Sequence, residues 1–144
     1  MLSIVAPGAA PLLAGGMYLT LARPEASPDP AAKGAVLLVR ADGCHEPAKV
    51  EVSAYAEGLV NGHRKTVPLK LTRLANGTTH AVAPGWPTEG VWVVRISGRL
   101  GLASIYTLVA LGPDGMDRAG TKSKYGSASE AEIAAMLKGL TRTS

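Results

Sequence analysis

Apolar and polar side chains alternate with a period of two in several short segments between residues 35 and 111. The clearest of them has apolar side chains at Val50, Val52, Ala54 and Ala56, with polar side chains at most of the positions between. Successive side chains of a strand point to opposite faces, so this period predicts strands with one face on a core and the other in water. Such strands must bury their apolar faces against one another, which favours paired sheets over a helical bundle.

Turn signals separate these segments at intervals of about ten residues. Asn61-Gly62 and Asn76-Gly77 favour tight turns, because Asn and Gly accept positive φ angles. The alternating segment between these two turns places Val67, Leu69 and Leu71 inward and Pro68 outward. Proline cannot donate a hydrogen bond to a neighbouring strand, so we expect this strand at a sheet edge or beside a bulge.

Two further segments, residues 35–41 and 103–111, are apolar almost throughout, which predicts strands buried on both faces. Residues 91–98 alternate again, and we expect Trp92 to lie in the core. Gly (17) and Pro (10) are plentiful while Phe is absent, which fits many turns around an aliphatic interior. These features predict an all-β chain that forms an antiparallel β-sandwich of about six or seven strands.

The N-terminal part of the chain has two interpretations. We place the sandwich domain at residues 35–112, after residues 1–34, which hold an apolar leader or first strand and a Pro-rich linker. Residues 1–22 carry no charged side chain, and Thr20-Leu21-Ala22 offers the small residues of a signal-peptide cleavage site. The segment from Gly16 to Ala22 fits a first strand equally well, and the sequence leaves both open. Three prolines in residues 23–34 predict an extended linker.

The C-terminal part, residues 113–144, is expected to hold an irregular segment and a short helix. Ser129 and Glu132 have the spacing of a capping box, in which each side chain bonds the backbone of the other residue at a helix start. The following apolar side chains fall on one helical face: Ile133, Met136, Leu137 and Leu140. We expect this face to dock on the sandwich of the same chain, with docking on another molecule as the alternative.

Candidates for chemistry are few, because the chain has one cysteine and three histidines. Cys44 and His45 are neighbours, but adjacent side chains of an extended chain point apart, so they do not form a nucleophile–base pair. We interpret residues 42–46 as a turn. The alternative is a soft-metal site for copper or zinc, with these candidate ligands: Cys44, His45, His63 and His80. No catalytic motif is present in the sequence, so we predict a protein that is not an enzyme and has no obligatory cofactor.

Basic side chains are concentrated in the middle of the chain, where residues 61–124 hold nine basic and three acidic ones. The tightest cluster is Arg64, Lys65, Lys70 and Arg73. It most simply protects an edge strand from pairing with other chains, and the alternative is a patch that binds an anionic surface. No aromatic residues interleave with the cluster, so specific nucleic-acid binding is not expected. Trp86, in a loop, is a candidate anchor for a binding partner.

A resemblance adds to this picture. Residues 86–92 read Trp-Pro-Thr-Glu-Gly-Val-Trp and lead into a late strand. This segment, with the strands and turns of residues 48–99, resembles secreted immunoglobulin-like domains of the YtkA-like and FixH-like type. The resemblance covers about a third of the chain. It implies a bacterial periplasmic or cell-surface immunoglobulin-like sandwich that acts as a carrier or accessory module, sometimes near metal handling. It supplies no catalytic residues, and the Met-rich and His-rich features of copper-linked members are sparse here.

We therefore expect a non-enzymatic extracytoplasmic β-sandwich, periplasmic or secreted, that serves as a binding or structural accessory domain. The expected partner is a protein or a cell-surface component, with no specific nucleic acid. We expect no transmembrane span in the mature domain, because Pro7, Pro11 and the Gly15-Gly16 pair interrupt the N-terminal apolar segment. Soft-metal binding and binding of an anionic surface are the two alternative functions.

Overall fold

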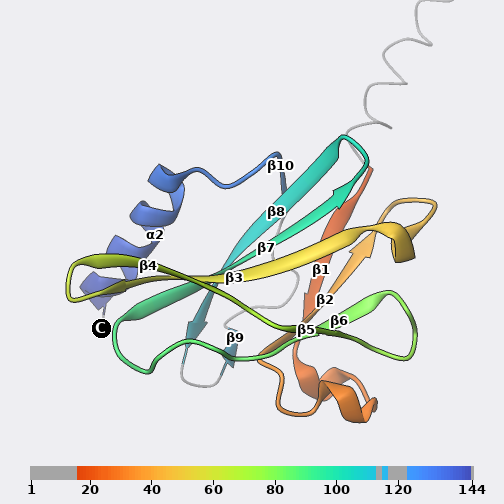
Figure 1. Ribbon diagram of the computed structural model, residues 1–144, viewed down its shortest axis with the longest axis horizontal. Coiled ribbons are helices and arrows are strands. Elements are labelled where there is room, and N and C mark those ends of the chain that lie inside the picture. The colour runs from red at the N-terminus through yellow and green to blue at the C-terminus, as the bar shows by residue number, and fades with distance from the viewer. Residues whose placement is uncertain (1–15, 113–114, 117–122, 144) are drawn as a thin grey trace, which may run out of the picture.

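The strands of this protein form two antiparallel sheets that pack face to face (Figure 1). The computed structural model describes residues 16–112, 115–116 and 123–143. The four-stranded sheet has the order β1-β2-β6-β5, and its strands are β1 (Tyr18–Ala22), β2 (Leu37–Asp42), β6 (Thr79–Val82) and β5 (Leu71–Arg73). The expected β-sandwich is therefore confirmed.

The second sheet has six strands, in the order β10-β8-β7-β3-β4 with β9 pairing β8. Its strands are β3 (Glu51–Val60), β4 (His63–Pro68), β7 (Val91–Leu100), β8 (Ala103–Gly112), β9 (Gly115–Met116) and β10 (Lys124–Tyr125). The two sheets hold more strands than the sequence predicted, because β5, β9 and β10 are only two or three residues long. Runs that short carry too few side chains to show a period of two.

The hairpin between β3 and β4 forms as its sequence predicts. Asn61 and Gly62 have φ angles of 51° and 79°, the left-handed values of a type I′ turn. The turn fixes the register, which pairs Val60 with His63. On β3 the side chain of Ala56 points into the core, and Gly58 lies so close to the Trp92 ring that a Cβ atom there would overlap it.

The core lies between the two sheets and is aliphatic apart from tryptophan. Trp92 is buried on β7, as predicted, and its ring nitrogen donates to the backbone oxygen of Glu89 at 2.8 Å. The buried residues of this cluster come from both sheets and include Leu19, Leu21, Leu37, Val39, Val50, Ala54, Val82, Val94, Ile96, Ile105 and Val109. Because the core needs strands from both sheets, the two sheets form one folding unit.

The segment after the first hairpin changes sheets, which the sequence did not predict. Residues 66–72 were expected to form one strand, but β4 ends at Pro68 in the six-stranded sheet and β5 begins at Leu71 in the four-stranded sheet. Between them, Leu69 N donates to Ala54 O at 2.9 Å and its side chain enters the core. The expectation that Pro68 lies on an edge strand is confirmed, because β4 is the last strand of its sheet.

Residues 18–22 form a strand of the sandwich. β1 pairs with β2 along its length, and Leu19 and Leu21 are buried in the core. The Pro-rich segment after it is not an extended linker, because it forms two short 3-10 helices, η2 (Pro24–Ala26) and η3 (Pro30–Ala32). The sandwich therefore begins before residue 35, the boundary expected from the sequence. The first fifteen residues, with Pro7 and Pro11, lie outside the described part of the chain.

The C-terminal helix α2 (Glu130–Thr143) covers the outer face of the six-stranded sheet (Figure 1). Ser129 caps its start, because the Ser129 Oγ accepts a hydrogen bond from Glu132 N at 3.1 Å. The predicted apolar face packs on the sheet in the same chain, with Ile133 and Leu137 buried against Val93. Of the segment expected to be irregular, residues 116–128, positions 117–122 lie outside the described part of the chain. None of the helices described is both long and apolar enough to cross a membrane.

Candidate binding site

The four candidate metal ligands do not converge. Cys44 and His45 lie in the turn after β2, where Cys44 packs against the core and His45 is exposed. His63 is exposed beside the β3–β4 turn, and His80 is buried on β6. Among the described residues, no group of three His, Cys, Asp or Glu side chains is placed to hold a metal ion. The copper or zinc hypothesis therefore lacks a ligand set in this part of the chain.

His80 is instead a buried side chain beside an arginine. Its Nδ1 atom has no hydrogen-bond partner, and burial followed by the positive charge of Arg73 lowers the pKa of this imidazole below its usual value. Arg73 is held in place by its hydrogen bonds to the backbone oxygens of Gly77 and Ala48, at 3.1 and 3.3 Å. His80 is therefore a neutral side chain packed against Arg73 rather than a metal ligand.

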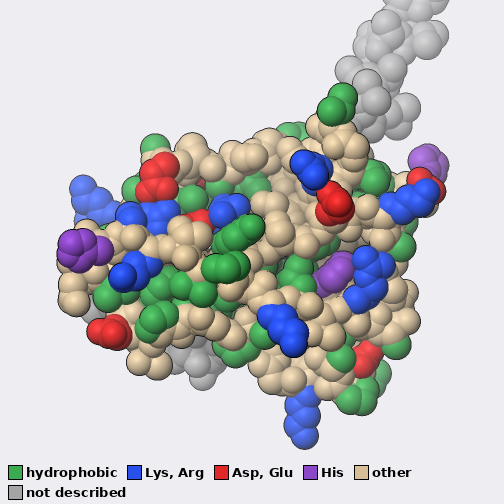
Figure 2. All heavy atoms as spheres, viewed as in Figure 1, with side chains coloured by type: hydrophobic (Ala, Val, Ile, Leu, Met, Phe, Trp, Pro, Cys, Tyr) green, Lys and Arg blue, Asp and Glu red, His purple; other side chains and the backbone are tan. Residues whose placement is uncertain are grey.

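The side chains of the basic cluster differ in their surroundings. Arg64 and Arg73 are committed to contacts within the chain, whereas Lys65 and Lys70 are exposed. On the face shown in Figure 2, Lys and Arg side chains are interspersed with Asp and Glu. The loop tryptophan, Trp86, is half-buried and packs against the core, so its ring covers one end of the sandwich interior.

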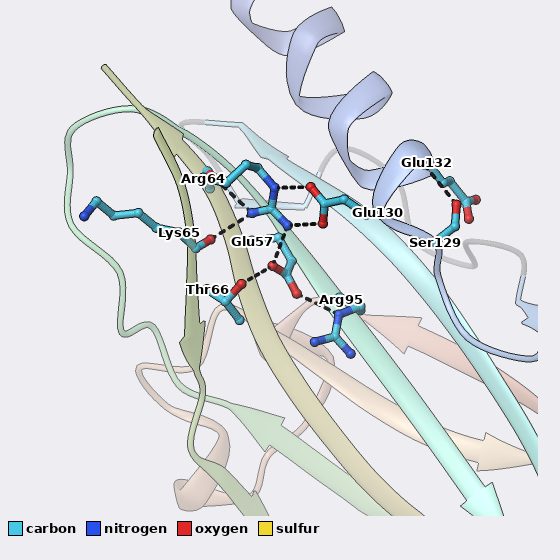
Figure 3. A network of polar contacts seen from close by, with 9 residues as sticks. Glu57, Arg64, Lys65, Thr66, Arg95, Ser129, Glu130 and Glu132 are labelled. Atoms are coloured by element: carbon cyan, nitrogen blue, oxygen red, sulfur yellow. Dashed lines mark hydrogen bonds and ion pairs between the residues drawn. The ribbon is translucent and has the colours of Figure 1, made fainter. Parts of the chain in front are cut away.

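Arg64 belongs to an ion-pair network around Glu57 (Figure 3). The Glu57 side chain is only 3% exposed and accepts from Arg95 at 2.8 Å, Arg64 at 3.1 Å and Thr66 at 2.6 Å. Burial by itself would raise the pKa of Glu57, but these hydrogen bonds outweigh it and lower the pKa. Arg64 also binds both carboxylate oxygens of Glu130, at 2.7 and 2.8 Å. The network thus fastens the first turn of α2 to the β3–β4 hairpin and is structural.

A cavity of about 290 Å³ opens on the outer face of the four-stranded sheet. This volume is near the lower end of the range for small-molecule sites. Its lining comes from β1, β2, β6, the segment after β1 and the β5–β6 turn, and comprises Thr20, Ala22, Ala26, Ser27, Pro28, Leu38, Val39, Arg40, Leu74, Asn76 and Thr79. We name it the outer-face cavity.

The floor of the outer-face cavity consists of two rows of side chains. Strand register places Thr20, Arg40 and Thr79 side by side on β1, β2 and β6. The next row on the same face includes Ala22 and Leu38. Side chains two positions apart on a strand share a face, so a polar row lies directly beside an apolar one. A small molecule with one polar and one apolar end matches such a floor.

Asp42 orients the arginine of the polar row. Its two carboxylate oxygens both accept from Arg40 Nε at 3.0 Å, and one of them also accepts from Thr20 Oγ1 at 2.6 Å. Within the described residues, the two Nη groups of Arg40 have no hydrogen-bond or ion-pair partner. The Arg40 side chain is 48% exposed, so these groups are accessible to a ligand.

The walls of the outer-face cavity are tied together by Asp29. One carboxylate oxygen of Asp29 accepts from Ala31 N at 2.9 Å and the other accepts from Ala75 N at 2.8 Å, across the gap to the β5–β6 turn. These bonds, that of Ala75 first, lower the pKa of Asp29. Asn76 stiffens the same turn, because its Oδ1 accepts from the backbone of Thr78 and Thr79. The cavity is therefore formed before any ligand arrives.

The residues of this cavity were not among the sequence candidates. One signal was present: Arg40 interrupts a strand that is otherwise apolar from Ala35 to Ala41. A charge on a strand that is apolar on both faces marks the place where one face opens to solvent. Asp29 and Asn76 gave no comparable signal, because polar residues are ordinary in turns.

The polar side chains among the described residues of the lining carry hydroxyl groups, an amide and one guanidinium. The nearby Asp42 carboxylate accepts from Thr20 Oγ1 at 2.6 Å and from Arg40 Nε at 3.0 Å, so it links two polar side chains of the floor. Comparison of the chain with protein-family models, curated proteins and solved structures found no match.

Proposed function

We propose that this protein is a non-enzymatic binding domain that holds a small ligand group in the outer-face cavity. The observation that carries the proposal is the pair of Arg40 Nη groups, which have no partner among the described residues, are oriented by Asp42 and lie beside an apolar row of the floor. The carboxylate beside the Thr20 hydroxyl, that of Asp42, is ion-paired with Arg40, which favours an orienting role in ligand binding.

We further propose that the sandwich is of the immunoglobulin-like type. The order β1-β2-β6-β5 corresponds to strands A-B-E-D of that fold, and β4-β3-β7-β8 corresponds to C′-C-F-G. The Trp-Pro-x-x-Gly-x-Trp segment at residues 86–92, which resembles YtkA-like and FixH-like domains, also supports this assignment. Domains of this kind serve as carrier or accessory modules, which agrees with a binding role.

We also propose that the protein is periplasmic or secreted. The support is the apolar N-terminal segment, which has no charged side chain before Arg23. Because β1 completes the four-stranded sheet, processing must occur before Tyr18 and not after Ala22. The intact mass of the protein from its native host tests this: we expect the leader to be absent and β1 to be present. A mass that matches the full chain, or a chain starting at Arg23, contradicts the proposal.

The alternative functions have less support. An anionic-surface patch would rest on Lys65 and Lys70, because Arg64 and Arg73 are bound within the chain. A soft-metal site would need converging ligands, and the described residues bring none together.

A matched pair of variants tests the binding role. Ala26 lines the outer-face cavity, so the Ala26→Phe substitution fills it, whereas Ala31 is exposed in η3 outside the lining. Thermal unfolding is measured with a panel of short-chain carboxylates, their amides and their amines. A ligand that binds only the folded state raises the melting temperature. We expect at least one probe to stabilise the unsubstituted protein and Ala31→Phe but not Ala26→Phe. No stabilisation, or equal stabilisation of all three proteins, contradicts the proposal.

A further inference from the structure

We infer that the outer-face cavity is a receptor for a carboxylate that carries a short apolar group. This inference rests on the proposed function and names the ligand class of the same site. The carboxylate lies against the Nη groups of Arg40, and the apolar group lies over Leu38 and Ala22. Three features support the assignment: the donors that the lining leaves unused, the planar geometry of a guanidinium, and the apolar row that lies beside the polar row of the floor.

The side chains of the lining leave more hydrogen-bond donors than acceptors available to a ligand. The hydroxyl oxygen of Thr79 accepts from Asn76 Nδ2 at 2.9 Å, and that of Ser27 accepts from Asp29 N at 3.1 Å, so both hydroxyl protons are available to a ligand. The amide oxygen of Asn76 already accepts two backbone N–H groups. A ligand that satisfies such a lining must bring acceptors.

Charge decides which kind of acceptor fits best. Arg40 carries a charge among the described residues that line the cavity; Asp42 holds its Nε side, and its Nη groups are left for an anionic acceptor. A guanidinium presents its N–H groups in a planar fork, which matches the two coplanar oxygens of a carboxylate. Thr79 lies beside Arg40 in the strand register and adds a third donor at the same place. A bidentate carboxylate contact, supported by a hydroxyl group, uses all of these donors.

The apolar part of the ligand follows from the neighbouring row. Leu38 and Ala22 lie two residues along their strands from Arg40 and Thr20, on the same face. Leu74 packs in one apolar cluster with Leu38, and Pro28 lines the cavity from the segment after β1. The volume of about 290 Å³, near the lower end of the range for small-molecule sites, limits the ligand to a small molecule or a short peptide end. Two sources supply this chemistry: a free short-chain acid and the C-terminal carboxylate of a peptide with small side chains.

Isothermal titration calorimetry of the full chain tests the inference. The probes are butyrate, butyramide and butylamine, together with N-acetyl-alanyl-alanine and its C-terminal amide. We expect butyrate or the acetylated dipeptide to bind, and the uncharged amides and the amine to bind at least about tenfold more weakly, since the charge-assisted contact is lost. Binding of the free acid but not the dipeptide assigns a small-molecule ligand, and the reverse assigns a peptide terminus.

Arg40→Gln is the test variant and Arg99→Gln is its matched control. Arg99 is an exposed arginine paired with Glu51 on the other sheet, so its loss leaves the cavity intact. We expect Arg40→Gln to weaken carboxylate binding by about tenfold or more, and Arg99→Gln to leave it unchanged. Equal binding of the acid and the amide overturns the carboxylate assignment, and so does an Arg40→Gln variant that binds butyrate like the unsubstituted protein. Either result leaves the proposed function in place, with a ligand of another class in the cavity. Failure of every probe, neutral ones included, overturns the proposed function as well.

Discussion

Two buried polar side chains, Glu57 and His80, differ in ionisation state because their neighbours differ. Glu57 is surrounded by donors, so it remains ionised although it is buried. His80 faces Arg73 and has an Nδ1 atom without a partner, so it remains neutral. Alternation along the sequence placed Glu57 on the outward side of β3, but it could not predict its burial. That burial depends on Arg64, Arg95 and α2, which are distant in the sequence.

His80 predicts a pH dependence of stability. Burial and the charge of Arg73 lower its pKa in the folded state below the usual value of about 6.5, so the unfolded chain binds the proton more readily. The stabilisation is therefore complete above about pH 6.5 and declines as the pH falls below it. We expect the free energy of unfolding, measured in urea at several pH values between about 5 and 7.5, to fall toward the acidic end.

The His80→Leu substitution should flatten this slope, and at neutral pH it should leave stability unchanged or higher by about 1 kcal/mol, because an unsatisfied polar atom is removed. His63→Leu, at an exposed position, is the control and should retain the slope. A slope that persists in His80→Leu would show that another group carries the effect.

At the scale of elements, the sequence predicted which side chains of a strand face the core, but it did not predict which sheet each strand joins. Val67, Leu69 and Leu71 face the interior as their spacing predicts, although the chain leaves one sheet and joins the other between β4 and β5. An inward position looks the same whichever sheet supplies it, because both sheets share one core. Periodicity therefore cannot locate the crossing, and the chain shows only Pro68 as a sign of it.

The helix α2 is predicted to be part of the folded unit rather than a loose appendage. Leu137 is 0% exposed and packs in a cluster with Val93 of the central strand β7. Truncating a buried leucine removes its contacts and leaves a cavity, so Leu137→Ala should lower the free energy of unfolding by about 2–5 kcal/mol. Leu102→Ala is the matched control, since Leu102 is 106% exposed at a hairpin turn, and it should change stability by less than about 0.5 kcal/mol. Urea unfolding followed by tryptophan fluorescence measures both, and equal effects would mean that α2 is not docked.

At the scale of the whole molecule, the outer-face cavity is a property of the assembled sandwich. Its floor needs three strands that are distant in the sequence, and its walls come from the β1–β2 connection and the β5–β6 turn. The sequence indicated the strands and the turn at Asn76, but not that Asp29 would join the two walls. Such a contact between distant segments depends on the topology, which no local pattern contains. For the same reason, the sequence candidates for binding lay elsewhere.

Amide chemical shifts of the full chain, recorded during a titration with butyrate, test the account most directly. Each backbone amide reports on its own surroundings, so the shifts locate the ligand without any substitution. We expect saturable changes at Thr20, Arg40 and Thr79 and in the two walls, with the α2 face of the other sheet unaffected. Changes centred on α2 or on the basic side chains of β4, or no saturable change anywhere, would contradict a carboxylate site in the outer-face cavity.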